Sequence, residues 1–278
     1  MYKHKRTVSS KKKARIGFAV AGVAAAAVVA ATSAQAIVGG QPTGIEKNSF
    51  LVMVQYDGNK FCTGTAISPT KIATSVACAA HTEQLDTTVV IAGRDNALDE
   101  KQGVKLKPDA WWIPNWYSDH SWQNRKNQTT NVPTNDMAVI HLAKPLPGTY
   151  KPIKMVPSDF KYKAGTKARI IGWGTTSEDQ EETTGELREA NVDVIPNSAC
   201  QRAYQGDYKS ANMVCAGKLE GGVDACSHDG GGPLLISDGK DERLAGIVSW
   251  GEGCAEAGNP GVYTKVSRFA ADFAALPD

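Results

Sequence analysis

The most informative run in this chain covers residues 224–233 and reads Asp224-Ala225-Cys226-Ser227-His228-Asp229-Gly230-Gly231-Gly232-Pro233. Ser227, His228 and Asp229 are residue types that enzymes combine as nucleophile, base and orienting carboxylate. Consecutive residues cannot form such a relay, so these three letters predict no catalysis by themselves. Gly230 has no side chain, so it cannot attack a substrate either.

Residues 1–36 have the three-part organisation of a secretory signal peptide. Residues 1–15 contain seven Lys or Arg and no acidic residue, residues 16–31 are a short apolar run, and Ala34-Gln35-Ala36 offers small residues for cleavage. The alternative is a transmembrane anchor, but a span needs about 20 apolar residues and this run is shorter. We therefore predict a secreted protein without a membrane anchor, starting at Ile37 or, after cleavage at Ala34, two residues earlier.

The charge of the mature chain differs from that of the precursor. The whole chain has 31 basic and 29 acidic residues, and seven of the basic ones lie in residues 1–36. The remainder has 24 basic and 29 acidic residues, which is a net charge of −5. Binding to nucleic acid needs a basic surface, so no nucleic-acid partner is predicted.

The cysteines indicate disulfides rather than a metal site. Six lie in the mature chain, at Cys62, Cys78, Cys200, Cys215, Cys226 and Cys254. An even number in an exported chain predicts three disulfides, although spacing alone does not choose among the possible pairings. There is no Cys-x-x-Cys pair and no regular acidic loop, so the sequence predicts no metal and no cofactor.

Short apolar runs rich in Val, Ile and Thr, broken by Gly, Pro, Asn and Asp, dominate the mature chain. Examples cover residues 50–56, 87–92, 137–142, 168–173 and 244–250. Many short strands with frequent turn residues are typical of an all-β sandwich or barrel. One helix is predicted over residues 266–276, where apolar residues recur at helical spacing, namely Val266, Phe269, Ala270 and Phe273.

Several runs of the mature chain resemble the motifs of one enzyme family. They are Ile37-Val38-Gly39-Gly40, Asn135-Asp136-Met137-Ala138, Ile171-Gly172-Trp173-Gly174, residues 224–233, Ser249-Trp250-Gly251 and Pro260-Gly261-Val262-Tyr263. Together they resemble the trypsin-like (chymotrypsin-fold) serine proteases over nearly all of residues 37–276. The resemblance implies one domain over residues 37–278 with two six-stranded antiparallel barrels, about 37–150 and about 160–265, and a C-terminal helix.

The resemblance also locates the catalytic positions, and two of the three lack a functional group. Counting 15 residues from Cys62 to the family's histidine position gives Ala77, and Gly230 stands at the serine position. Asp136 matches the aspartate and is the only retained member of the triad. His81 is the alternative base, but its use shifts the register by four residues. That shift is about 6 Å of helix rise, so we expect a surface histidine.

A binding pocket is implied beside these positions. Asp224 matches the aspartate at the bottom of a trypsin-type pocket, where one fixed anion selects Arg or Lys. The implied walls are Ser249, Trp250, Gly251 and Gly261. The implied oxyanion-hole donors are the amides of His228 and Gly230, but histidine disfavours the backbone angles that the family's glycine tolerates at this position.

Two further features follow from the resemblance. The ammonium group of a new N-terminus at Ile37 is expected to pair with Asp229 and so to shape the pocket. The implied disulfides are Cys62–Cys78, Cys200–Cys215 and Cys226–Cys254.

Four of the six tryptophans lie in one segment, at Trp111, Trp112, Trp116 and Trp122. In the family this region leads to a loop beside the substrate cleft, and it is longer here than in a minimal trypsin. Some of these rings are expected to pack on the first barrel. Exposed ones would be anchors for a peptide, a sugar or a protein partner.

We predict from these observations a secreted pseudoprotease, which keeps a pocket for the Arg or Lys side chain of a peptide or protein but does not cleave it. The first alternative is an active endopeptidase that cleaves after Arg or Lys with an unrecognised nucleophile. The second alternative is a module that binds a carbohydrate or another ligand through the Trp-rich segment.

Overall fold

The computed structural model describes residues 37–57, 60–80, 85–123, 129–180 and 182–277. The signal peptide predicted over residues 1–36 lies outside these ranges. No helix within them has the length and apolar character that crossing a membrane requires.

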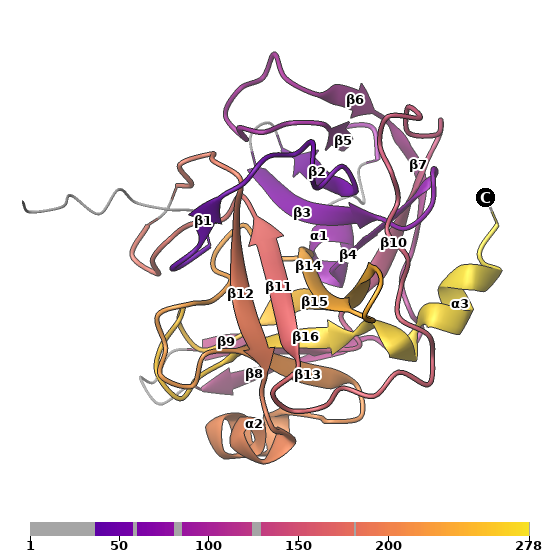
Figure 1. Cartoon of the computed structure of the whole chain (residues 1–278). Helices are drawn as coiled ribbons and strands as arrows, with labels where there is room; N and C mark the ends of the chain where they lie inside the picture. The colour runs from indigo at the N-terminus through magenta and orange to yellow at the C-terminus, as the bar shows by residue number, and fades with distance from the viewer. Residues whose placement is uncertain (1–36, 58–59, 81–84, 124–128, 181, 278) are drawn as a thin grey trace, which may run out of the picture. The chain divides into compact units, whose positions relative to one another are not determined.

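The first half of the mature chain forms an antiparallel sheet of seven strands (Figure 1), in the spatial order β6-β5-β2-β3-β4-β10-β7. The strands are β2 (Leu51–Tyr56), β3 (Lys60–Ala66), β4 (Lys71–Thr74), β5 (Val89–Ala92), β6 (Val104–Leu106), β7 (Pro108–Trp112) and β10 (Ala138–Leu142). Only Lys107 separates β6 from β7, so one bent segment supplies both edges of the sheet. The sheet therefore corresponds to a barrel of six chain segments.

The second half forms a closed ring of strands. Its members are β11 (Lys167–Gly172), β12 (Arg188–Val194), β13 (Met213–Gly217), β14 (Pro233–Ser237), β15 (Glu242–Trp250) and β16 (Gly261–Lys265). Because β12 pairs with both β11 and β13, the six strands close on themselves. The short strand β1 (Gln41–Pro42) adds to β12, so the start of the mature chain joins this second sheet. The predicted pair of antiparallel barrels is confirmed.

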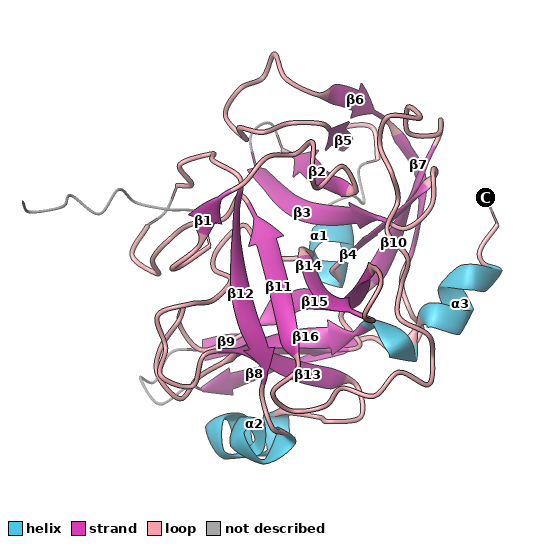
Figure 2. Cartoon of the chain, viewed as in Figure 1, coloured by secondary structure: helices cyan, strands magenta, loops and turns pink. Residues whose placement is uncertain are grey.

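Helices are few and short (Figure 2). They are α1 (Val76–Ala80), α2 (Asn197–Tyr204), α3 (Ala270–Ala275) and the 3-10 turns η2 (Gln205–Asp207) and η3 (Val266–Arg268). The helix predicted over residues 266–276 is thus split, since Phe269 (φ −114°, ψ −4°) separates η3 from α3. Its apolar face is as expected, because Val266, Phe269 and Phe273 are all buried in the core.

The three disulfides join the same pairs that the resemblance implied. Cys62–Cys78, Cys200–Cys215 and Cys226–Cys254 have Cα–Cα distances of 5.9, 6.3 and 5.3 Å. Cys78 lies on α1 and Cys226 lies in the loop before β14, so two of the bridges brace the segments that carry the predicted site.

A two-stranded hairpin stands apart from both sheets. It consists of β8 (Ser118–Gln123) and β9 (Thr129–Thr134), paired in register from Ser118 with Thr134 to Gln123 with Thr129. The hairpin comes from the long Trp-rich segment of the first half, yet β9 lies against β15 of the second barrel.

Candidate functional site

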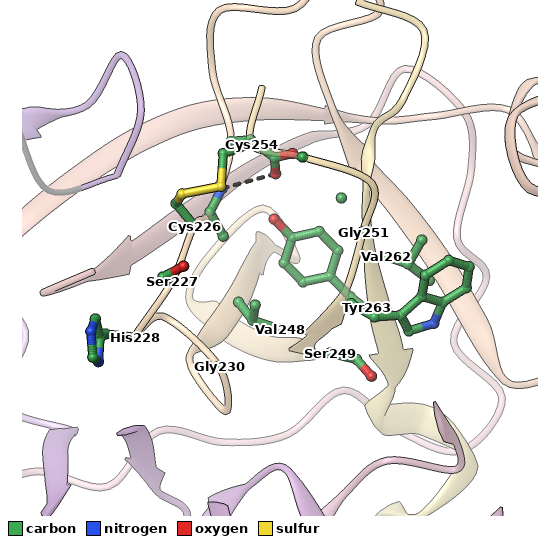
Figure 3. A pocket seen from close by; sticks show the side chains of 15 residues that line it. Cys226, Ser227, His228, Gly230, Val248, Ser249, Gly251, Cys254, Val262 and Tyr263 are labelled. Atoms are coloured by element: carbon green, nitrogen blue, oxygen red, sulfur yellow. Dashed lines mark hydrogen bonds between the residues drawn. A yellow bond between two sulfur atoms is a disulfide. The ribbon is translucent and has the colours of Figure 1, made fainter. Parts of the chain in front are cut away.

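A cavity of about 310 Å³ is enclosed by three segments of the second barrel. It is lined by the loop around residues 224–230, by the end of β15 and by the start of β16, and the Cys226–Cys254 bridge lies at its wall (Figure 3). All five residues predicted for the pocket border it, namely Asp224, Ser249, Trp250, Gly251 and Gly261.

Asp224 is the buried anion of this cavity, with a residual exposure of 3%. Its Oδ1 atom accepts a hydrogen bond from the Ala225 amide at 2.8 Å. A Cβ atom at Gly261 would lie 2.5 Å from the same oxygen, so only glycine allows this close approach. Burial, with a smaller effect from the nearby Asp229 charge, raises the pKa of Asp224 to about 7. A cation entering the cavity would therefore relieve an unfavourable buried charge.

Tyr263 lines the pocket, as the resemblance of residues 258–263 to the family's pocket walls implied, but no role was predicted for its hydroxyl. Its hydroxyl is buried and has no hydrogen-bond partner among the described residues. Burial, together with the charges of Asp224 and Asp229, raises the pKa of Tyr263 well above its usual range. Strand alternation was the available signal, since Gly261 and Tyr263 lie two residues apart on β16 and so share one face.

Asp136 keeps its hydrogen-bond donors although Ala77 stands at the histidine position. Its Oδ1 atom accepts a hydrogen bond from the Val76 amide at 2.7 Å, and its Oδ2 atom accepts one from the Ser249 hydroxyl at 2.5 Å. Asn135 adopts the left-handed conformation (φ 58°) and donates from its side chain to the Trp116 carbonyl at 3.0 Å, which positions the aspartate. Burial raises the pKa of Asp136, and these donors oppose the shift.

Ala77 and Gly230, which the resemblance places at the base and nucleophile positions, have no side-chain group that could act in either role. Ala77 is exposed on α1, in the turn that donates to Asp136. A Cβ atom at Gly230 would meet only Cys78 Sγ within 4 Å, at 3.9 Å. Space for a serine therefore remains, and the missing chemistry is a matter of residue identity. His81, the alternative base, lies outside the described residues.

His228 has the unfavourable backbone that the sequence predicted. Its φ is 71°, in the left-handed region that costs a non-glycine residue about 1–2 kcal/mol. Its ring stacks on Phe61 with centroids 5.2 Å apart, and its carbonyl accepts from the Thr63 hydroxyl at 3.4 Å. Figure 3 shows His228 at the edge of the site, apart from Tyr263. Both His228 and Gly230 line the cavity, and their role as oxyanion donors stays a prediction.

The segment that begins at Ile37 is anchored beside the pocket. Ile37 is fully buried, and Val38 and Asp224 exchange two backbone hydrogen bonds of 3.0 and 3.3 Å. Asp229 is also fully buried and accepts from the amides of Gly174 and Cys226 at 2.8 and 3.0 Å. Burial raises the pKa of Asp229 to about 7. The pairing of a free Ile37 ammonium with this carboxylate stays a prediction.

These buried carboxyl groups predict how stability depends on pH. The folded-state pKa of Asp224 and of Asp229, about 7, lies above the ordinary aspartate value of 3.8. Their contribution to stability is therefore fully present below about pH 4 and is lost as the pH rises through 7. We expect the free energy of unfolding to fall by a few kcal/mol between pH 4 and pH 7.5, as measured by urea denaturation with the disulfides intact.

The control for this prediction is a chain that retains Ala36 before Ile37. If the free ammonium of Ile37 pairs with Asp229, the chain beginning at Ile37 loses less stability over this pH range than the extended chain does. Asp193 titrates outside the range, because its hydrogen bonds to Lys167 and Lys218 lower its pKa. A stability that increases from pH 4 to pH 7.5 in both chains would contradict the prediction.

The tryptophans of the long segment are distributed over several environments. Trp112 packs edge-on against Phe273 at 5.1 Å, and Trp116 stacks on Phe269 at 6.4 Å, so both contact the C-terminal segment. Trp111 is 41% exposed and, together with Trp112, lines a second cavity of about 430 Å³. The side chain of Trp122 lies outside the description. Ligand binding by this segment stays a prediction, and this cavity is where Trp111 and Trp112 could take part in it.

No group of His, Cys, Asp and Glu in the described ranges could hold a metal ion. The main cavity presents a buried anion and a neighbouring phenol to a cationic group, beside a centre where Gly230 and Ala77 provide no reacting atom.

Comparison with known proteins agrees with the fold. The family described as "Trypsin" matches residues 37–271. A trypsin of Saccharopolyspora erythraea is 35% identical over 235 residues, covering 84% of this chain and 94% of that protein. Trypsin eta of Drosophila erecta is 33% identical over 254 residues, which are 87% and 91% of the two chains. Serine protease 56 of Homo sapiens is 32% identical over 241 residues, and the match covers 84% of this chain but 37% of that longer protein. The chain belongs to the trypsin-like serine protease family.

Proposed function

We propose that this protein is a secreted, non-catalytic member of the family that binds an Arg or Lys side chain of a peptide or protein partner. The main support for this proposal is that one site combines a formed binding pocket with a catalytic centre that lacks two reacting side chains. The pocket around Asp224 is complete and its anion is buried, whereas the adjoining centre has Ala77 and Gly230 in place of a base and a nucleophile. Acyl transfer needs both groups, but binding of a cation needs neither.

Secretion is part of the proposal and rests on two observations. Residues 1–36 have the pattern of a signal peptide. All six cysteines are paired, and disulfides persist in oxidising compartments outside the cytosol.

The main alternative is an active endopeptidase with a different nucleophile. Ser227 is an exposed serine that lines the cavity, and the Ser249 hydroxyl is already engaged by Asp136. The neighbouring imidazole belongs to His228, which is adjacent in sequence and stacked on Phe61. The ring of His228 is engaged with Phe61, which favours the binding function over catalysis through Ser227.

The proposal is tested with the secreted, mature chain and two measurements. Hydrolysis of an Arg-terminated chromogenic peptide is followed at pH 8, with the Saccharopolyspora erythraea trypsin as the active control. Binding of benzamidine, an arginine mimic, is measured by calorimetry. We expect benzamidine binding with no turnover above a matched blank.

Two results would overturn the proposal. Turnover that a serine-directed phosphonylating reagent abolishes would establish an active enzyme, and the Ser227→Ala variant would then show whether this hydroxyl is the nucleophile. Failure of benzamidine to bind would remove the pocket as the functional site.

A further inference from the structure

The β8–β9 hairpin packs against the second barrel through Val132. This side chain on β9 is fully buried, although its strand belongs to neither barrel. Val132 belongs to an apolar cluster whose other members come from α2 and the second barrel, among them Ala203, Tyr204, Met213, Trp250 and Val262. A valine from the first half of the chain thus completes a cluster of the second half.

The same cluster contains one wall of the main cavity. Trp250 lines that cavity, and its ring packs edge-on against Tyr204 with centroids 4.8 Å apart. Only 9% of Trp250 remains exposed. Its indole Nε1 is buried without a hydrogen-bond partner among the described residues, which is costly for a polar group. The surface of Trp250 beyond the pocket is therefore covered by protein.

The covered surface adjoins the end of β15, where its pairing with β14 stops. β15 pairs with β14 only as far as Ile247, and Val248 bonds to the loop at Gly231 and Gly232. From Ser249 onward no strand pairs with this side of β15 in the described part of the chain. An extended segment that placed a basic side chain on Asp224 would find its backbone partners here. β9 lies against this strand.

We propose that the β8–β9 hairpin fills the space beside β15 where the main chain of an extended ligand would bind. The pocket would then bind a basic group only at the end of a chain or in a small molecule. The ligand class is an arginine- or lysine-like terminal residue, or a free guanidine or amidine. An Arg within a continuous segment is excluded. Two lining residues of the cavity reach the surface, the exposed Ser227 and the half-exposed His228. This inference rests on the proposed binding function.

The experiment compares three probes in calorimetry with the mature chain: benzamidine, arginine amide, and a blocked pentapeptide with Arg at its centre, acetyl-Ala-Ala-Arg-Ala-Ala-amide. For the native chain we expect arginine amide to bind at least ten times more tightly than the pentapeptide. In the Val132→Asp variant, the hairpin should leave its place because a charge cannot stay in the apolar cluster. The affinity for the pentapeptide should then lie within about threefold of the affinity for arginine amide. Benzamidine affinity should stay the same.

Two further variants make the result decisive. A chain in which a short Gly-Ser link replaces residues 119–133 removes the hairpin without burying a charge, and it serves if Val132→Asp does not fold. Val104→Asp is the matched control, because Val104 lies on β6 with 40% exposure and should leave all three affinities unchanged.

The outcomes separate the two claims. If benzamidine does not bind the native chain, both the proposed Arg/Lys-binding function and this inference are wrong. If benzamidine binds and the pentapeptide binds the native chain as tightly as arginine amide, only the inference is overturned. The inference is also overturned if the pentapeptide remains weak after the hairpin is removed.

Discussion

The double substitution Ala77→His with Gly230→Ser is expected to create peptidase activity toward arginyl substrates that neither single substitution creates. The site is prepared for both side chains. Asp136 is held by the Val76 amide at 2.7 Å and by the Ser249 hydroxyl at 2.5 Å, next to the turn that carries Ala77. A Cβ atom at Gly230 meets nothing closer than Cys78 Sγ at 3.9 Å.

The expected gain is large because a nucleophile and its base act as a unit. Removing either one in a working serine protease costs nearly as much as removing both, so restoring only one should give almost nothing. For the double variant we expect kcat/KM to rise on the order of 10³-fold or more above the background of the native chain, measured with arginine p-nitroanilide, which has no residue before Arg. The gain should disappear after treatment with a serine-directed phosphonylating reagent.

The matched control is Ala77→His with Gly230→Ala, which adds the same Cβ atom without a hydroxyl. A second control adds His228→Gly, because the φ of 71° at His228 strains the loop that carries the two expected oxyanion donors. If the double variant shows no activity but the variant that also carries His228→Gly does, the residue at position 228 is a third change that prevents catalysis. If neither variant cleaves the substrate while benzamidine still binds, restoring the two side chains does not restore catalysis, and the prediction is wrong.

Asp224→Asn is expected to reduce the affinity for benzamidine by about a hundredfold or more, since one partner of a buried charge pair disappears. The change keeps the shape and the hydrogen bond from the Ala225 amide. Asp109→Asn is the matched control, because Asp109 is exposed and pairs with His141 at 2.6 Å outside this cavity. Calorimetry at pH 8 compares the three proteins.

The same measurement has a pH dependence of known sign. The pKa of Asp224 is about 7 in the empty pocket, and a bound cation needs the ionised carboxylate. Affinity for benzamidine should therefore fall as the pH decreases, by about thirtyfold between pH 8 and pH 5.5. Protonation of Asp229, whose pKa is also about 7, occurs over the same range. If the Asp224→Asn variant showed a pH dependence as steep as that of the native chain, the assignment to Asp224 would be contradicted.

Much of the site could be predicted from the sequence because its parts are local. The cysteine register located Ala77, and the run at residues 224–233 located Asp224, Asp229 and Gly230. Loss of a nucleophile or a base is a matter of residue identity, and no fold can supply the missing atoms. Short strands and their turns were predicted for a similar reason, since alternation and turn residues are read within a few positions.

The tertiary structure decided what depends on contacts between distant residues. Ser249 reaches Asp136 across 113 positions, and Val76 reaches it across 60, so the carboxylate keeps its donors without a histidine. Val132 belongs to no sequence motif, yet in the fold it is buried in one apolar cluster with Trp250. Residue identity determined that positions 77 and 230 carry no reacting group. Packing decided that Asp224 is buried in a cavity lined by the end of β15 and the start of β16, because burial and hydrogen-bond partners arise only when distant parts of the chain meet.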